Sequence, residues 1–260
     1  MIGNKPSIYN AQSVYNQGGG GTFDVDLGGG EKQTLTFPPY LVPVEYIDTT
    51  DYTEDALNII GAAQFPTDNN YLLKCVFQQG ATTSNTETIF GFSACYNWTS
   101  NYDSSFGCRK SDSNFLVELS SGSNAHSFSG INETKKIIAS FNAASKLFKV
   151  EYSDESGYFD YNDTRALPSK NFGQWSIFNN WRVQASSTFH GKFFYSYVRK
   201  GGEIIALWIP ARCNDDNVKQ PYVVECVSGA VGVNCSENKS TMGIYFGPDI
   251  DLSDVSSYFV

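Results

Sequence analysis

The sequence predicts an all-β protein, an antiparallel β-sandwich with an extended N-terminal segment. Aromatic residues make up 15% of the 260 residues and there are 23 glycines, a combination that favours strands and turns over helices. Short apolar or alternating segments recur along the chain, and turn residues separate many of them. No uninterrupted helical period with caps is visible. Many short strands without intervening helices are typical of a sandwich.

Residues 1–38 differ in composition from the rest of the chain. The stretch 22–27 alternates between apolar and polar residues, and it lies between the glycine runs 18–21 and 28–30. One strand cannot bury itself, so it must pair with the main domain or with another chain. We expect an anchoring and oligomerising segment, in which the assembly residues are Tyr15, Phe23, Val25 and Leu27.

The main domain is predicted to cover residues 39–250, followed by a C-terminal tail at 251–260. Residues 41–48 form a strand with a proline near its start, which a sheet edge tolerates. Residues 56–63 are apolar and are interpreted as a helical turn or a loop. Further strands are predicted at 71–77, 88–96, 114–119, 134–142, 146–152, 174–179, 181–188, 192–199, 203–209, 222–227 and 243–246.

One hairpin is especially clear in the pattern. Residues 135–141 and 146–152 are predicted to pair as two strands, and the four residues 142–145 join them. Lys149 and Glu151 are predicted to share one face of the second strand. The opposite, inward face would carry Phe148, Val150 and Tyr152.

The densest strand-forming run, 189–227, contains a tight turn at 199–202 and carries most of a family resemblance. Its motifs are Phe-His-Gly-Lys-Phe-Phe at 189–194 and Ile-Pro-Ala-Arg at 209–212. Together with Glu-Tyr-Ile-Asp-Thr at 45–49, Thr-Ile-Phe-Gly at 88–91 and Phe-Gly-Pro-Asp at 246–249, they resemble the concanavalin A-like lectin/glucanase family in its laminin-G-like form, as found in phages and gut bacteria. The resemblance covers about residues 40–250 and implies a jelly-roll sandwich. Two positions depart from it: Ala206-Leu207-Trp208 replaces a charged pair, and Tyr222-Val223 replaces Tyr-Asp.

The function that this resemblance implies is that of a non-enzymatic phage virion structural protein, a head or tail fibre or appendage. The first ten residues look like the start of such a fibre protein. We expect other virion proteins as partners, a homo-oligomer (a trimer by preference), and a host surface glycan or receptor as ligand. No signal peptide is visible, so we expect synthesis in the host cytoplasm and location in the virion. The alternatives are a secreted glycan-binding adhesion domain and a sandwich-fold glycoside hydrolase.

Charge excludes one class of partner. The net charge of −9 argues against nucleic acid, because phosphate neutralisation needs clustered lysine and arginine. It also argues against an anionic membrane surface, and no run approaches the ~18–20 apolar residues that span a bilayer.

Carbohydrate binding needs exposed aromatic rings with amides nearby. Two clusters have that composition, and the same aromatics have an alternative interpretation as core or rim residues. The candidate ligand-binding residues are Tyr96, Trp98, Tyr102, Trp175 and Trp181.

Sequence motifs typical of catalytic or metal-binding sites are weak in this chain. The chain lacks the Glu-x-Asp-x-Glu strand of the sandwich glucanases, and its two histidines, His126 and His190, accompany no nucleophile motif. We therefore predict no catalytic residue, no resident metal ligand and no cofactor. Calcium is the one cation considered, because the loops 48–51, 214–216 and 249–251 offer oxygen ligands. The six cysteines are expected to be free thiols, and Cys95 with Cys108 is the first pair to check for a disulfide.

Overall fold

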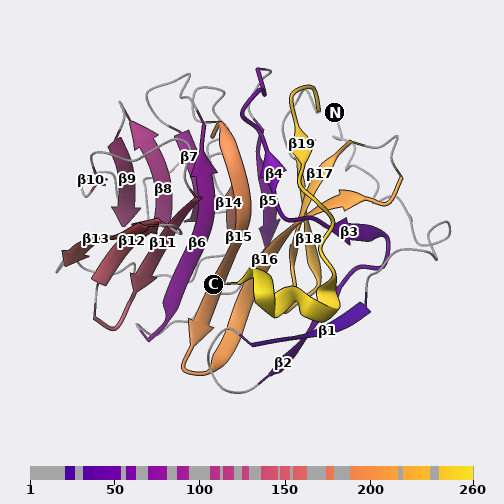
Figure 1. Ribbon diagram of the computed structural model, residues 1–260, viewed down its shortest axis with the longest axis horizontal. Helices are drawn as coiled ribbons and strands as arrows, with labels where there is room; N and C mark the ends of the chain where they lie inside the picture. The colour runs from indigo at the N-terminus through magenta and orange to yellow at the C-terminus, as the bar shows by residue number, and fades with distance from the viewer. Residues whose placement is uncertain are drawn as a thin grey trace, which may run out of the picture.

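The computed structural model describes residues 21–26, 32–53, 57–62, 70–80, 87–93, 106–111, 114–119, 125–128, 136–145, 147–152, 155–162, 174–178, 188–215, 219–234 and 240–259. In this part of the chain the architecture is an antiparallel β-sandwich, which confirms the predicted fold class (Figure 1). None of the helices in the described part is long and apolar enough to cross a membrane.

The larger sheet contains the central strands of the molecule. It runs in the order β13 (Glu155–Asn162), β12 (Leu147–Tyr152), β11 (Lys136–Asn142), β6 (Leu72–Gln79), β15 (Gly191–Lys200), β16 (Glu203–Cys213) and β17 (Pro221–Glu225). Short strands extend it: β3 (Leu41–Pro43) pairs with β16, and β4 (Ile47–Asp48) pairs with both β15 and β19 (Tyr245–Phe246).

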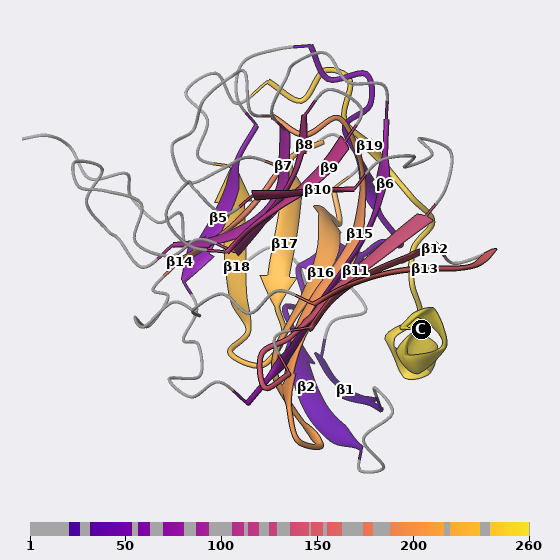
Figure 2. The ribbon, with the colours of Figure 1, turned by 90° about the vertical axis from the view of Figure 1, so that its left-hand side faces the viewer.

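The second sheet faces the first and joins it along one edge. Its order is β10 (Ala125–Phe128), β9 (Asn114–Leu119), β8 (Phe106–Ser111), β7 (Glu87–Ser93), β14 (Gln174–Ile177), β5 (Ile59–Ala62) and β18 (Ala230–Asn234). Because β18 also pairs with β17, hydrogen bonding continues from one sheet to the other. Figure 2 shows the two layers from the side.

The main core lies between the sheets and is centred on two tryptophans. The rings of Trp175 and Trp208 meet edge to face with centroids 6.0 Å apart, and Phe90 packs on Trp208 at 5.2 Å. All three side chains are fully buried. They come from β14, β16 and β7, so this cluster ties the second sheet to the centre of the first.

The outer face of the larger sheet is apolar as well, and a third layer covers part of it. This layer consists of the hairpin β1 (Gly21–Val25)–β2 (Gln33–Phe37) and the C-terminal 3-10 helix η3 (Leu252–Tyr258), both visible outside the sheet in Figure 2. Backbone and side-chain hydrogen bonds dock β2, from Thr36 N to Cys226 O at 2.9 Å and between Gln33 and Ile204 at 2.7 and 2.8 Å. The buried outer-face cluster contains Phe23, Val25, Leu35, Phe37, Val76, Ile138, Leu207, Ile209, Val224, Leu252 and Val255.

Several local expectations need correction. The segment 56–63 contains the strand β5 rather than a helical turn, and it lies between β14 and β18. The pattern also missed β2, β8, β10, β13 and β18, and the predicted tail at 251–260 contains η3. Most of the strand predicted at 181–188 lies outside the described residues.

Candidate binding site

Four of the five predicted glycan-binding aromatics, Tyr96, Trp98, Tyr102 and Trp181, lie outside the described residues. The fifth, Trp175, is 0% exposed and belongs to the core between the sheets. A ring without exposed surface cannot stack on a sugar, so Trp175 is corrected from candidate ligand contact to core residue.

Two of the four predicted assembly residues are described. Phe23 and Val25 are buried against the outer face of this chain's own larger sheet. Their side chains could meet a neighbouring chain only if the hairpin left that face. Tyr15 and Leu27 lie outside the described residues.

The most distinctive polar feature is a row of residues directly opposite one another across five strands. Lys136 of β11 faces Gln78 of β6, Gln78 faces Lys192 of β15, Lys192 faces Asp48 of β4, and Asp48 faces Tyr245 of β19. We call these five residues the outer row.

The outer row belongs to the outer face because the sequence neighbours of its members point inward. Ile137, Phe77, Phe193, Ile47 and Ile244 all belong to the inter-sheet core. Successive side chains of a strand alternate between faces, so the row projects to the outside. Each of its members is partly exposed, and Tyr245 is 54% exposed. The row is therefore accessible beside the third layer.

Aromatic rings lie beneath the two lysines of the row. Lys192 Nζ is 4.5 Å from the ring centroid of Tyr46, and Lys136 Nζ is 4.2 Å from that of Phe194. The two rings contact each other edge to face, with centroids 5.4 Å apart. Cation–π contacts of this geometry hold an ammonium group in place without using its N–H donors.

Carboxylates flank both ammonium groups at a distance. Lys192 Nζ is 3.7 Å from Asp48 Oδ2, and Lys136 Nζ is 3.8 Å from Glu45 Oε1. Both separations exceed the usual length of a charge-assisted hydrogen bond. The site thus balances two positive and two negative charges while keeping ammonium donors available to an incoming oxygen.

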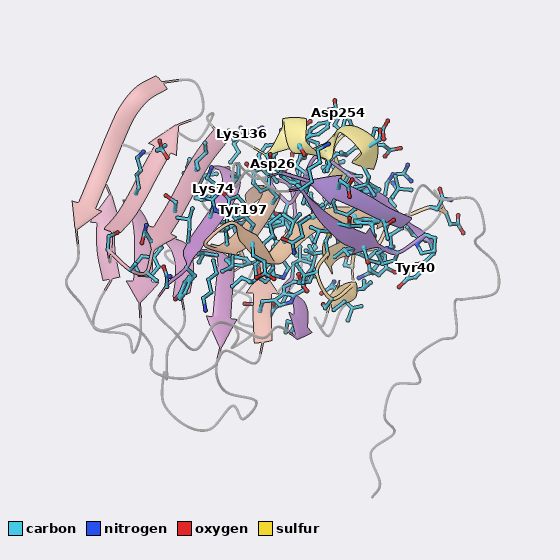
Figure 3. All side chains as sticks on the ribbon, turned by 90° about the horizontal axis from the view of Figure 1, so that it is seen from below. Asp26, Tyr40, Lys74, Lys136, Tyr197 and Asp254 are labelled. Carbon is cyan, nitrogen blue, oxygen red and sulfur yellow. The ribbon has the colours of Figure 1, made fainter. Side chains whose placement is uncertain are left out.

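A second charged patch lies further along the same face, on β6, β12 and β15. Lys74 Nζ is 5.7 Å from the ring centroid of Tyr197, and Figure 3 labels both residues together with Lys136. Burial lowers the pKa of Lys74; Arg199 and Lys149 lower it further and Glu151 opposes them. Burial also raises the pKa of Tyr197, which is only 4% exposed. The covered ring leaves this patch less open to a ligand than the outer row.

The predicted calcium loops are partly occupied by internal contacts. Asp249 accepts two hydrogen bonds from Arg212, 3.1 Å from Nε and 2.9 Å from Nη2. Asp251 caps η3, and hydrogen bonds from Ser253 lower its pKa. Asp48 Oδ1 accepts from Thr50 N at 2.9 Å. Among the described residues, no group of three or more histidine, cysteine or acidic side chains is arranged to hold a metal ion.

Glu225 is a buried carboxylate that sequence reasoning did not single out. Only 4% of it is exposed, and it accepts backbone N–H groups of Leu207 at 3.2 Å, Val227 at 3.0 Å and Ser228 at 2.9 Å, as well as the Ser228 hydroxyl. These donors occupy both oxygens. We therefore interpret Glu225 as the residue that fixes the turn between β17 and β18, rather than as a catalyst.

Sequence and structure comparisons leave the family open. No family model matches the chain, and no curated protein matches it. Among solved structures, it is similar to a SAP-like pentraxin from Limulus polyphemus, with a TM-score of 0.41 and 14% identity, over 59% of this chain and 74% of that one. It is also similar to the extracellular region of zebrafish Gpr126/Adgrg6 (TM-score 0.43, 14% identity, 66% and 23% covered) and to the NanB sialidase of Streptococcus pneumoniae (0.38, 11%, 55% and 26%). The chain thus spans about a quarter of the receptor and sialidase chains. With all three TM-scores below 0.5, the β-sandwich assignment rests on this chain's own strand pairing.

Proposed function

We propose that this protein is a non-catalytic, glycan-binding β-sandwich whose outer row is the ligand contact. The observation that carries the proposal is the pair of ammonium groups at Lys136 and Lys192, each held over an aromatic ring in the row that ends at the exposed Tyr245. Gln78 and Asp48 complete the row with an amide and a carboxylate.

A saccharide suits this chemistry. Sugar rings present apolar C–H faces that stack on an aromatic ring such as Tyr245, while their oxygens accept hydrogen bonds from ammonium and amide donors. Asp48 can accept from a sugar hydroxyl. Neighbouring strands are ~4.8 Å apart, so a row across five strands extends over roughly 19 Å and can contact a short oligosaccharide.

Binding without turnover is part of the proposal. Glycoside hydrolysis requires two carboxylates facing each other across the scissile bond. Both carboxylates at the outer row, Glu45 and Asp48, instead lie beside a lysine ammonium. Positioned lysines that neutralise carboxylates support recognition rather than acid–base chemistry.

The proposed setting is a phage virion, on which the sandwich is displayed outward as a fibre or appendage component, as a homotrimer, with other virion proteins as partners. This part of the proposal is supported by the sequence resemblance alone. Residues 21–25 and 33–37 belong to the folded third layer, so we assign attachment to residues 1–20. A variant that lacks residues 1–20 should be absent from purified virions and should have a different oligomeric state. Its melting temperature should equal that of the full chain. Unchanged virion incorporation would contradict the attachment role.

Screening the purified protein against immobilised neutral and acidic oligosaccharides tests the glycan proposal. Tyr245→Ala should weaken the binding of any ligand found by about tenfold, corresponding to ~1.4 kcal/mol. Lys192→Met, which keeps an apolar stem over Tyr46, should also weaken it. Tyr40→Ala, at a partly exposed tyrosine far from Lys136 in Figure 3, is the matched control and should bind like the wild type. Equal binding by all variants would remove the outer row as the site, and release of new reducing ends would refute the non-catalytic part.

A further inference from the structure

The β1–β2 hairpin presents one strand edge that no described strand covers. Within the described part of the chain β1 pairs only with β2, whose far side is docked on the sheet through Thr36 and Gln33. Gly21, Thr22 and Asp24 of β1 are exposed, while Phe23 and Val25 hold the strand on the sheet. Such an edge is a template for pairing with another extended chain.

A groove runs along this edge, between β1 and η3. Its volume is about 760 Å³, and it is lined on one side by residues 21–24 and 26 and on the other by Asp251 and residues of η3. At one end the hydrogen bond from Asp26 N to Ser256 Oγ, 3.2 Å, closes it. An entering segment would thus lie along Gly21–Asp24.

The groove is negatively charged. Four carboxylates line it, from Asp24, Asp26, Asp251 and Asp254, together with a single lysine, Lys32. Asp26 and Asp254 are labelled in Figure 3. These carboxylates do not converge on one point that could hold a metal ion. They are spread along the groove, as suits a chain that carries several separate positive charges.

We propose that the β1 edge binds an extended basic segment of another protein by strand addition. Main-chain hydrogen bonds to β1 supply the pairing, and lysine or arginine side chains of the segment reach the groove carboxylates. A second copy of this chain suits the edge less well, because its own β1 would bring Asp24 and Asp26 against the same charges. The partner is thus distinct from this chain. The inference does not depend on the outer row, which lies beside the third layer on other strands.

A synthetic peptide of alternating lysine and threonine, with a fluorescent label, is the probe for this proposal. The intact protein should bind it, with an affinity that falls as salt rises. A probe with the same side chains and alternate N-methylated amides should bind at least tenfold more weakly, because N-methylation removes the donors needed for strand addition. Equal binding of both probes, or binding of neither, would overturn the proposal.

Variants of the protein test whether the probe binds in the groove between β1 and η3. The double variant Asp24→Asn with Asp254→Asn should weaken probe binding about tenfold, whereas Glu203→Gln, at an exposed turn elsewhere, should leave it unchanged. Identical affinities of the two variants would place the probe outside the groove. If increasing protein concentration produced dimers that the probe dissociates, the occupant would be a second copy, and the assignment of a basic partner would be wrong.

Discussion

The indole of Trp175 occupies the space that a side chain at Gly232 would need. A Cβ at Gly232 would overlap Cη2 of the ring and lie 3.0 Å from Cζ2 and Cζ3. Gly61, directly opposite Trp175 on β5, is closed in the same way by the same ring. The absence of side chains at these positions lets the Trp175 indole lie across β5 and β18.

Gly232→Ala should therefore lower the free energy of unfolding by about 1–3 kcal/mol, the usual cost of overpacking a core. Urea denaturation followed by tryptophan fluorescence measures it. Gly21→Ala is the control, because nothing lies within 4 Å of an added Cβ there. Equal stabilities of the two variants would contradict the tight packing of Trp175.

Phe37→Ala should destabilise the protein by about 3–5 kcal/mol, because this side chain is fully buried under the third layer. Hydrogen exchange should also speed up in η3, which shares the cluster with the hairpin. Thr36→Ala, at an exposed side chain, should change neither quantity. If exchange rose only within the hairpin, η3 would be docked independently.

Glu225→Gln should cost about 1–3 kcal/mol, because an amide NH₂ would replace one carboxylate oxygen and face backbone N–H groups. The amide cannot accept from Leu207, Val227 and Ser228 at once. Chemical denaturation of this variant next to Glu203→Gln measures the difference. A loss no greater than that of the control would show that the turn does not need the carboxylate.

The free energy of unfolding should fall at alkaline pH. Burial raises the pKa of Tyr71 to about 12, from its ordinary value of 10.0. The unfolded chain ionises this phenol first, so unfolding becomes more favourable between pH 10 and 12, by up to roughly 2–3 kcal/mol. Unfolding free energies at pH 9, 10 and 11 test the trend, and Tyr71→Phe should flatten it.

Of the three cysteines Cys75, Cys213 and Cys226, alkylation under native conditions should modify one preferentially. Cys75 and Cys226 are buried, and burial raises the pKa of Cys226, which keeps its thiol protonated and unreactive. Cys213 is partly exposed and should react first with iodoacetamide, as peptide mass spectrometry would show. Labelling of Cys226 at a similar rate would mean that β17 opens readily.

Sequence patterns predicted correctly the elements whose structure depends mainly on residues close together in the chain. The hairpin β11–β12 forms as expected: Phe141 pairs with Phe148, and Asn142 Oδ1 accepts from the backbone of Ala144 and Ser145 in the turn. Lys149 and Glu151 share a face and lie 2.8 Å apart. Alternation and turn chemistry suffice for such a pair of strands.

The short apolar segment at β5 was misassigned for a physical reason. Ile59, Ile60 and Gly61 show no alternation, and a run of this length fits a helical turn as well as a buried strand. Its neighbours, β14 and β18, are more than 100 residues away in sequence. Pairing with these two distant strands is what makes the segment 59–62 a strand.

The outer row could not be predicted from local sequence patterns either. Alternation places Lys192 or Gln78 on an exposed face, but the register of five strands decides which residues become neighbours. Asp48 and Tyr245, which lie opposite each other, are separated by about three quarters of the chain. The sequence-based search for exposed aromatics selected Trp175, because a buried ring and an accessible one have the same local composition.

The third layer has a consequence for synthesis of the chain on the ribosome. The hairpin at 21–37 is made early, yet the strands β15, β16 and β17 that it covers follow residue 190. At translation rates of about 5–20 residues per second, its apolar side waits roughly 8–30 seconds for its binding surface. η3 comes later still, so the layer closes only after residues 252–258 have been made. A nascent chain interrupted before that point exposes both the hairpin and the uncovered sheet face to chaperones.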